Sequence, residues 1–120
     1  MASAHNNLGS TLLQSGDIES AERFFREALE LEPALAAARA NLGLVLKRGG
    51  DLAGAETEYR SSLEMEPMNL DVRYNLAALL RQAGRLEQAR EELLSLLRID
   101  PTDREARRAL REIALDPGGP

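Results

Sequence analysis

The sequence contains no cysteine and no tryptophan, and His5 is its only histidine. Without cysteine there is neither a disulfide nor a thiolate zinc site, and the redox compartment of the protein is left open. One histidine supplies neither a histidine-based metal cluster nor a hydrolase triad, so we interpret His5 as a packing residue. The sequence also lacks a GxxxxGKS/T phosphate loop and a GxGxxG turn after a strand. We therefore predict no catalytic residues, no metal ligands, no cofactor and no enzyme activity.

Positive net charge and long apolar runs are absent as well. The formal charge is -5 at pH 7, which argues against nucleic acid as a partner because phosphate neutralisation needs a basic face. No apolar stretch approaches the roughly 18 uncharged residues that a membrane span requires. What remains is a chain of 120 residues, 43% hydrophobic and rich in alanine, leucine, glutamate and arginine, which is typical of one helical domain.

An internal repeat of 34 residues is marked by Pro33, Pro67 and Pro101. The same offset superimposes three blocks, residues 2–35, 36–69 and 70–103. Seven positions are identical in all three blocks: Asn7/Asn41/Asn75, Leu8/Leu42/Leu76, Leu12/Leu46/Leu80, Gly16/Gly50/Gly84, Ala21/Ala55/Ala89, Leu29/Leu63/Leu97 and Pro33/Pro67/Pro101. Each block therefore holds two helical stretches, which the glycine separates and the proline closes.

Turn and cap residues predict where these helices begin and end. The glycine at the centre of each block is placed for the positive φ that follows a helix. Asp17 and Asp51 come next and are placed to cap the second helix, whereas Arg85 offers no such cap. The predicted helices cover residues 3–15, 18–31, 35–48, 52–65, 69–82, 86–98 and 103–115.

Small residues predict how the two helices of a pair pack. Gly9 and Gly43 lie inside predicted helices, where glycine costs about 1 kcal/mol relative to alanine, which suggests the close approach of another backbone. The partner helix carries Ala21 or Ala55 at a fixed offset, so small residues are expected to face each other. Larger apolar residues are expected to fill the seam: Leu8, Leu12 and Leu29, with their equivalents in later blocks.

One residue pattern recurs at fixed offsets in the blocks. The first block reads Leu8-Gly9, Ala21, Phe25, Ala28 and Pro33; the second reads Leu42-Gly43, Ala55, Tyr59, Ser62 and Pro67; the third reads Leu76-Ala77, Ala89, Leu93, Leu96 and Pro101. With this pattern the chain resembles the tetratricopeptide repeat family, a 34-residue helix-turn-helix repeat. It departs from the family where His5, Arg39 and Arg73 replace the usual tryptophan.

The resemblance implies a fold and a class of function. The implied fold is an all-α, right-handed solenoid of three antiparallel helix-turn-helix units, closed by a seventh, capping helix at residues 104–115. Residues 1–115 would form a single domain, and residues 116–120 a disordered tail. The implied function is a protein-protein interaction module that binds an extended peptide or a partner helix in a concave groove.

The first helix of each pair lines this groove in the family. The predicted ligand-binding residues are Asn6, Asn7, Asn41, Leu44, Lys47, Arg48, Tyr74, Asn75, Ala78, Arg81 and Arg108. In one interpretation the equivalent asparagines form a row that bonds to peptide backbone, which resembles the asparagine ladder of O-linked N-acetylglucosamine transferases. In the other, each asparagine bonds to the neighbouring helix and orients the repeats.

Charge and shape suggest the ligand. The cations of the predicted groove favour an acidic segment or a C-terminal carboxylate, and Tyr74 is placed to anchor an apolar side chain; a solvated surface and ordinary packing are the alternatives. Chaperone co-factors of the family clamp a C-terminal dicarboxylate with two lysines, two asparagines and an arginine. The matching residues carry no positive charge, so we do not predict binding to such tails: Asn6, Ser10, Asn41, Asp71 and Asn75. Weak end-to-end self-association and a targeting role within a larger enzyme stay open as other functions.

Overall fold

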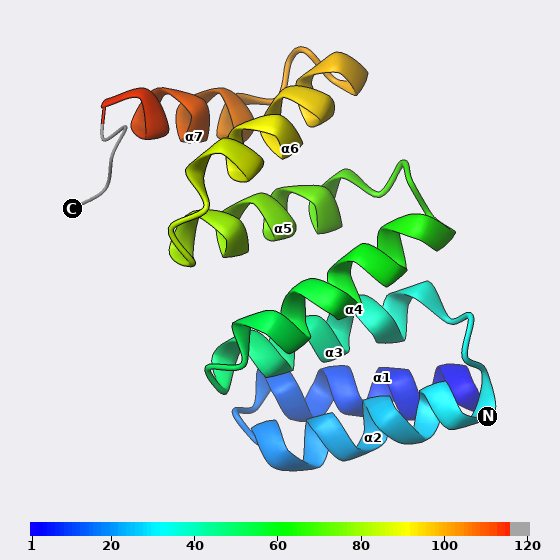
Figure 1. Ribbon diagram of the computed structural model, residues 1–120. Helices are drawn as coiled ribbons and strands as arrows, with labels where there is room; N and C mark the ends of the chain where they lie inside the picture. The colour runs from blue at the N-terminus through cyan, green and yellow to red at the C-terminus, as the bar shows by residue number, and fades with distance from the viewer. Residues whose placement is uncertain (116–120) are drawn as a thin grey trace. The chain divides into compact units, whose positions relative to one another are not determined.

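A computed structural model describes residues 1–115, and Figure 1 follows seven helices along this part of the chain. They are α1 (Ala2–Gln14), α2 (Ile18–Leu31), α3 (Ala36–Arg48), α4 (Leu52–Met65), α5 (Leu70–Gln82), α6 (Leu86–Ile99) and α7 (Arg104–Leu115). Each boundary lies within one residue of its predicted position, and residues 1–115 contain no strand. The predicted all-α class is confirmed, while the predicted tail at residues 116–120 lies outside the described residues.

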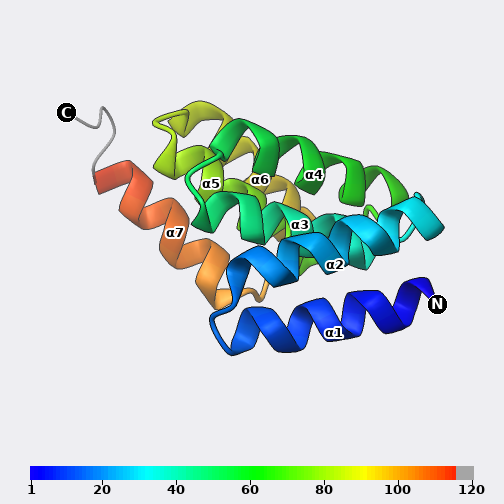
Figure 2. The ribbon, with the colours of Figure 1, turned by 90° about the horizontal axis from the view of Figure 1, so that it is seen from below.

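The helices belong to two compact units, residues 1–67 and the residues from 68 onward, and each unit is described by itself. In the first unit, α1 pairs with α2, α3 pairs with α4, α2 packs against α3, and α1 also contacts α3. Figure 2 shows α1 running beside α2. In the second unit, α5 pairs with α6, and α7 packs against α6. A single domain over residues 1–115 concerns both units together and stays a prediction.

The turn inside each helix pair is built as its glycine predicts. Gly16, Gly50 and Gly84 have φ of 91°, 91° and 82°, a conformation that residues with a Cβ rarely adopt. Asp17 then caps α2 by accepting a hydrogen bond from the Ser20 amide at 3.2 Å. The second pair repeats this cap and the third pair lacks it, as predicted.

Aromatic rings interlock with the glycines inside the first two pairs. A Cβ added to Gly9 would lie 2.6 Å from Phe25 Cε1, and one added to Gly43 would lie 2.8 Å from Tyr59 Cδ1. The predicted alanines of the second helices are fully buried. The close approach at both glycines is therefore present, but the partner helix makes its nearest contact with an aromatic ring rather than with its alanine.

The prediction that Leu8 fills the seam of its own pair is wrong. Its side chain is 46% exposed, whereas the equivalents Leu42 and Leu76 are 2% and 1% exposed. Leu42 is buried because it packs on the preceding pair, in a cluster with Phe25 and Leu29. No described helix precedes α1 to cover Leu8 in the same way. In the first unit this repeat position thus serves packing between successive pairs rather than within one pair.

The side chains that replace the family's tryptophan each contact a residue 19 positions later in the sequence. This residue lies on the second helix of the same pair. Arg39 donates a hydrogen bond to Glu58 Oε1 at 3.1 Å, and Arg73 makes the corresponding ion pair in the third pair. In the first pair, the rings of His5 and Phe24 lie 6.0 Å apart between centroids. These contacts tie the two helices of a pair together, and they place His5 among packing residues.

Candidate functional site

The predicted ligand-binding residues all lie on the first helices of the pairs and on α7. Four are exposed: Asn7, Arg48, Asn75 and Arg108. Six are half-buried: Asn41, Leu44, Lys47, Tyr74, Ala78 and Arg81. The remaining one, Asn6, is 9% exposed and counts as buried. Each unit therefore presents a part of the predicted set, and the two parts are built differently.

In the first unit, Asn41 joins α3 to α1. Its Nδ2 atom donates to Asn6 Oδ1 at 3.0 Å and to Ser10 Oγ at 3.2 Å. Both hydrogens of the amide are used, so Nδ2 has no donor left for a ligand. The sequence left two interpretations of this asparagine, a bond to a peptide ligand or a bond to the neighbouring helix. The structure contains the bond to the neighbouring helix.

The oxygen of the same amide is still open. Asn41 Oδ1 has no hydrogen-bond partner within residues 1–115, and it is not among the buried unpaired atoms of this part of the chain. The two Nδ2 hydrogen bonds fix the amide plane, so this acceptor keeps one direction at the surface formed by α1 and α3. A fixed, solvated acceptor is suited to the backbone N–H of a ligand, because it does not depend on the ligand's sequence.

Positive charge gathers at the end of α3. Lys47 and Arg48 lie in its last turn, where the helix dipole favours cations. Nearby, the ring of Tyr59 from α4 is 1% exposed, and its Oη atom has no hydrogen-bond partner in the described part of the chain. Burial raises the pKa of Tyr59, and the positive charge of Arg48 offsets a part of this rise. The neutral phenol is therefore favoured in the folded protein.

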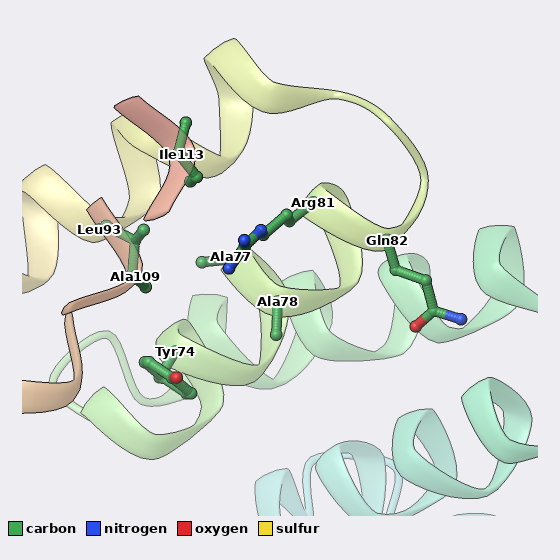
Figure 3. Close-up of a pocket in the computed structure, with 8 residues that line it drawn as sticks. All are labelled: Tyr74, Ala77, Ala78, Arg81, Gln82, Leu93, Ala109 and Ile113. Carbon is green, nitrogen blue, oxygen red and sulfur yellow. The ribbon is translucent and has the colours of Figure 1, made fainter. Parts of the chain in front are cut away.

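In the second unit, residues of α5, α6 and α7 line an open cavity of about 380 Å³. Figure 3 shows the residues that line it: Tyr74, Ala77, Ala78, Arg81, Gln82, Leu93, Ala109 and Ile113. Three of them, from α5, belong to the predicted ligand-binding set. Arg81 links α5 to α7, with its Nη1 atom 3.1 Å from Glu112 Oε1. An apolar wall with one aromatic ring and one cation is the usual construction of a site that binds a side chain.

The cavity follows from an exchange at the glycine and aromatic positions. In the second pair, Gly43 leaves room for the ring of Tyr59. The third pair has Ala77 and Leu93 at the same repeat positions. The alanine Cβ occupies space that the ring uses in the other pairs, and the leucine is smaller than a ring, so the space beyond it stays unfilled.

A second exchange makes the cavity apolar. A hydrogen-bonded polar trio joins α1 to α3, and the residues two repeats later line the cavity between α5 and α7. The polar trio is Asn6, Ser10 and Asn41, and its counterparts are Tyr74, Ala78 and Ala109. The same junction between successive first helices is therefore a polar lock in one unit and an open apolar cavity in the other. Sequence reasoning missed Leu93, Ala109 and Ile113 as site residues, and the loss of the amide at Ala109 was the available signal.

Charge is divided between the two helices of the pairs. Helix α1 has no acidic or basic residue other than its histidine, α3 has three cations and no acid, α5 has two arginines and one aspartate, and α7 has four arginines and two glutamates. Helices α2, α4 and α6 each carry more acidic than basic residues. The chain has a formal charge of -5, yet no first helix is net negative, and neither is α7.

The described residues offer little that suggests reaction chemistry. Within residues 1–115, no three acidic or histidine side chains are grouped so that they could hold a metal ion. Nor does this part of the chain contain a helix with the length and apolar character of a membrane span. In the turn between α6 and α7, the Thr102 hydroxyl and amide donate hydrogen bonds to the Asp100 carboxylate. These hydrogen bonds lower the pKa of Asp100.

Successive helix pairs of equal length, each with the same glycine turn, define a helical-repeat protein. Two models of the tetratricopeptide repeat match the chain, one over residues 1–66 and the other over residues 46–113. The chain belongs to the tetratricopeptide repeat family.

Among solved structures, the chain is similar to the first tetratricopeptide repeat domain of Spaghetti (RPAP3) bound to the HSP90 peptide SRMEEVD. The TM-score is 0.89 at 18% sequence identity, and the likeness covers 95% of this chain and 90% of that chain. At this identity the likeness shows the fold, an all-α helical-repeat solenoid. A comparison with curated proteins gives no match.

Proposed function

We propose that this protein is a non-catalytic interaction module that holds an extended, acidic peptide along its first helices. The observation that carries the proposal is the division of charge between the helices. Helices α1, α3, α5 and α7 are neutral or positive although the chain as a whole has a charge of -5. An acidic segment is attracted to these helices and repelled by the second helices, which steers it toward one side of each pair.

Membership of the family supports the interaction role in general terms. The similar domain of Spaghetti was solved with a bound peptide, and that peptide, SRMEEVD, is itself acidic. The positions that match the chaperone-tail clamp of the family carry no cation here, as the sequence showed: Asn6, Ser10, Asn41, Asp71 and Asn75. We therefore expect an acidic ligand that is held elsewhere on the first helices, and no clamp of that kind.

Hydrogen bonding favours an extended ligand over a helical one. Asn41 Oδ1 is an unused acceptor, and Asn7 and Asn75 are exposed at equivalent repeat positions. An extended peptide advances about 3.3 Å per residue and has backbone N–H groups to donate. A partner helix satisfies its own backbone groups internally and would leave these amides unused. Of the two ligands that the sequence allowed, an extended peptide and a partner helix, the asparagines therefore support the extended peptide.

The proposal is tested by removing the cations at the end of α3. The variant K47A/R48A is compared with R23A/R26A, which removes the same charge from α2. Binding to an array of acidic peptides is measured by fluorescence anisotropy at low and at moderate salt. We expect K47A/R48A to weaken binding by about tenfold at low salt, because each partly exposed charge contact contributes about 0.5–1 kcal/mol. Equal losses in both variants, or no loss in either, would contradict the proposal.

Self-association is a second candidate, and one observation favours it. Leu8 is 46% exposed, while its equivalent Leu42 is buried in a cluster with residues of the preceding pair. The surface of α1 around Leu8 is therefore an apolar place for another helix pair to pack. Light scattering over a wide range of concentrations decides this point, because a mass that stays monomeric at high concentration rules out assembly through α1.

A further inference from the structure

We infer that the cavity between α5 and α7 is a specificity pocket for one aliphatic side chain of an acidic peptide. The inference rests on the proposed function and adds to it the identity of one ligand residue. It also predicts that the second unit distinguishes peptides by one of their side chains. The reasons are the size of the cavity, its lining, and the cation at its edge.

The size of the cavity suits a single side chain. Ligand pockets in proteins begin at about 300 Å³, and a cavity of roughly 150 Å³ lined by apolar residues already accepts benzene. The volume of about 380 Å³ here is above both values. It admits a leucine, isoleucine or methionine side chain with room to spare, and it is too small for a folded segment.

The lining selects an aliphatic side chain. Leu93 and Ile113 are 2% and 1% exposed and form apolar walls. Ala77, Ala78 and Ala109 leave the space between the helices unfilled, because each side chain is a single methyl group. A charged side chain in such a place would lose its hydration without gaining a partner on these walls, which disfavours it strongly.

The edge of the cavity selects acidic neighbours for that side chain. The Arg81 guanidinium has five N–H donors. Among the described residues, only Glu112 accepts a hydrogen bond from it. It is partly exposed and lines the cavity, so a carboxylate next to the bound aliphatic residue meets a cation with free donors. Together α5 and α7 carry six arginines and three acidic residues, which favours a ligand of negative charge.

The first unit is built differently at the matching place. At the equivalent junction, Asn41 bonds to Asn6 and Ser10, and these polar groups occupy the space between α1 and α3. An aliphatic side chain placed there would break hydrogen bonds without a replacement, which is unfavourable. At this junction the first unit therefore offers polar groups, whereas the second unit offers an apolar pocket for one side chain.

A pair of matched variants tests the pocket. Ala78→Leu places a larger side chain in the cavity, and the same repeat position in α3 is already a leucine, Leu44, so the change is compatible with the helix pair. Ala114→Leu is the control, because Ala114 is exposed on α7 and does not line the cavity. Circular dichroism melts verify that both variants are folded.

A second variant guards against misfolding of the first. A77G/L93F rebuilds the glycine and aromatic pair that the first two helix pairs use. The ring is expected to fill the space that Leu93 leaves open, while the glycine provides room for it as Gly9 does for Phe25. A weaker preference for an aliphatic side chain in both A78L and A77G/L93F would then share one cause, a filled pocket.

The probes are acidic peptides of about eight residues, made of aspartate and glutamate with a single leucine or a single alanine at successive positions. With the 120-residue chain, we expect the best leucine peptide to bind about 10- to 50-fold more tightly than its alanine analogue, from the burial of two to three methylene-sized groups. A78L and A77G/L93F are expected to reduce this preference to less than about threefold, and A114L to keep it.

The outcomes separate this inference from the proposed function. If leucine and alanine peptides bind the protein equally, or if A78L and A77G/L93F keep the preference for leucine, the pocket is overturned while peptide binding stands. If none of the acidic peptides binds, the pocket and the proposed function are both overturned. A basic peptide series with lysine in place of the acidic residues completes the test, because equal binding of that series would contradict the role given to Arg81.

Discussion

The close contact between Gly43 and the Tyr59 ring predicts that a substitution at one of these residues changes the effect of a substitution at the other. Gly43→Ala adds a Cβ that would lie 2.8 Å from two atoms of the Tyr59 ring, and this ring is only 1% exposed, so it has no free space to move into. Tyr59→Leu removes the ring. The double variant G43A/Y59L reproduces the alanine and leucine that the third pair carries as Ala77 and Leu93. We expect the two changes to compensate for each other.

The magnitudes follow from opposing terms. Alanine gains about 1 kcal/mol over glycine inside a helix, while overpacking of a filled core costs about 1–3 kcal/mol, so G43A should lose about 1 kcal/mol of unfolding free energy. Y59L leaves a cavity and should lose about 2–4 kcal/mol, reduced because the buried Tyr59 hydroxyl has no partner to lose among the described residues. In the double variant the new Cβ enters space that the ring vacated. A coupling of about 1–2 kcal/mol in favour of the double variant is therefore expected.

The assay is urea unfolding of the wild type, both single variants and the double variant, followed by circular dichroism under identical conditions. The coupling is the difference between the loss in the double variant and the sum of the single losses. Strict additivity, or a double variant that is less stable than this sum, would refute the interlock as the reason for the glycine.

Two further predictions concern the first unit. Asn41→Ala should lower the free energy of unfolding by about 1–3 kcal/mol, because Asn6 Oδ1 would remain buried without its donor; thermal melts measure this, and an unchanged melting temperature would remove the orienting role. Tyr59→Phe should be neutral or stabilising by up to about 1 kcal/mol, since the hydroxyl makes no hydrogen bond within residues 1–115. Burial raises the pKa of Tyr59, so the folded protein favours the protonated phenol. The free energy of unfolding is therefore highest below the unfolded pKa of about 10, and the part that depends on this protonation is lost as the pH rises through the folded pKa. Melting curves between about pH 9 and 11 should therefore fall more steeply for the wild type than for Tyr59→Phe, and parallel curves would contradict this sign.

The helix boundaries were predictable because local signals determine them. A glycine with positive φ and an aspartate cap occur at the same repeat positions, and both depend on the backbone within a few residues. The buried alanines were predictable for a similar reason, since the repeat brings them to the same contact each time.

Contacts between helices were harder to predict, because they depend on pairs of residues far apart in the sequence. Arg39 reaches Glu58 across 19 positions, and neither residue alone indicates an ion pair. The sequence analysis placed Leu8 in the wrong seam because its repeat position packs against a preceding pair, which the 34-residue pattern alone does not show.

The cavity in the second unit shows the same limit for the candidate site. Its predicted residues, Tyr74, Ala78 and Arg81, were found from their place on a first helix. The cavity depends on the exchange at Ala77 and Leu93, two residues that the repeat pattern shows without indicating that they leave a space. A volume is the outcome of several side chains acting together, so it became visible only in the structure.

The central claim is that acidic peptides bind to the first helices. The most direct measurement is a titration of the isotope-labelled protein with an acidic, leucine-containing peptide, followed by two-dimensional amide NMR. The account predicts shifts concentrated on α1, α3, α5 and α7, with Tyr74, Ala78 and Arg81 among the most affected residues. Shifts concentrated on α2, α4 and α6, or an unchanged spectrum at saturating peptide, would contradict it.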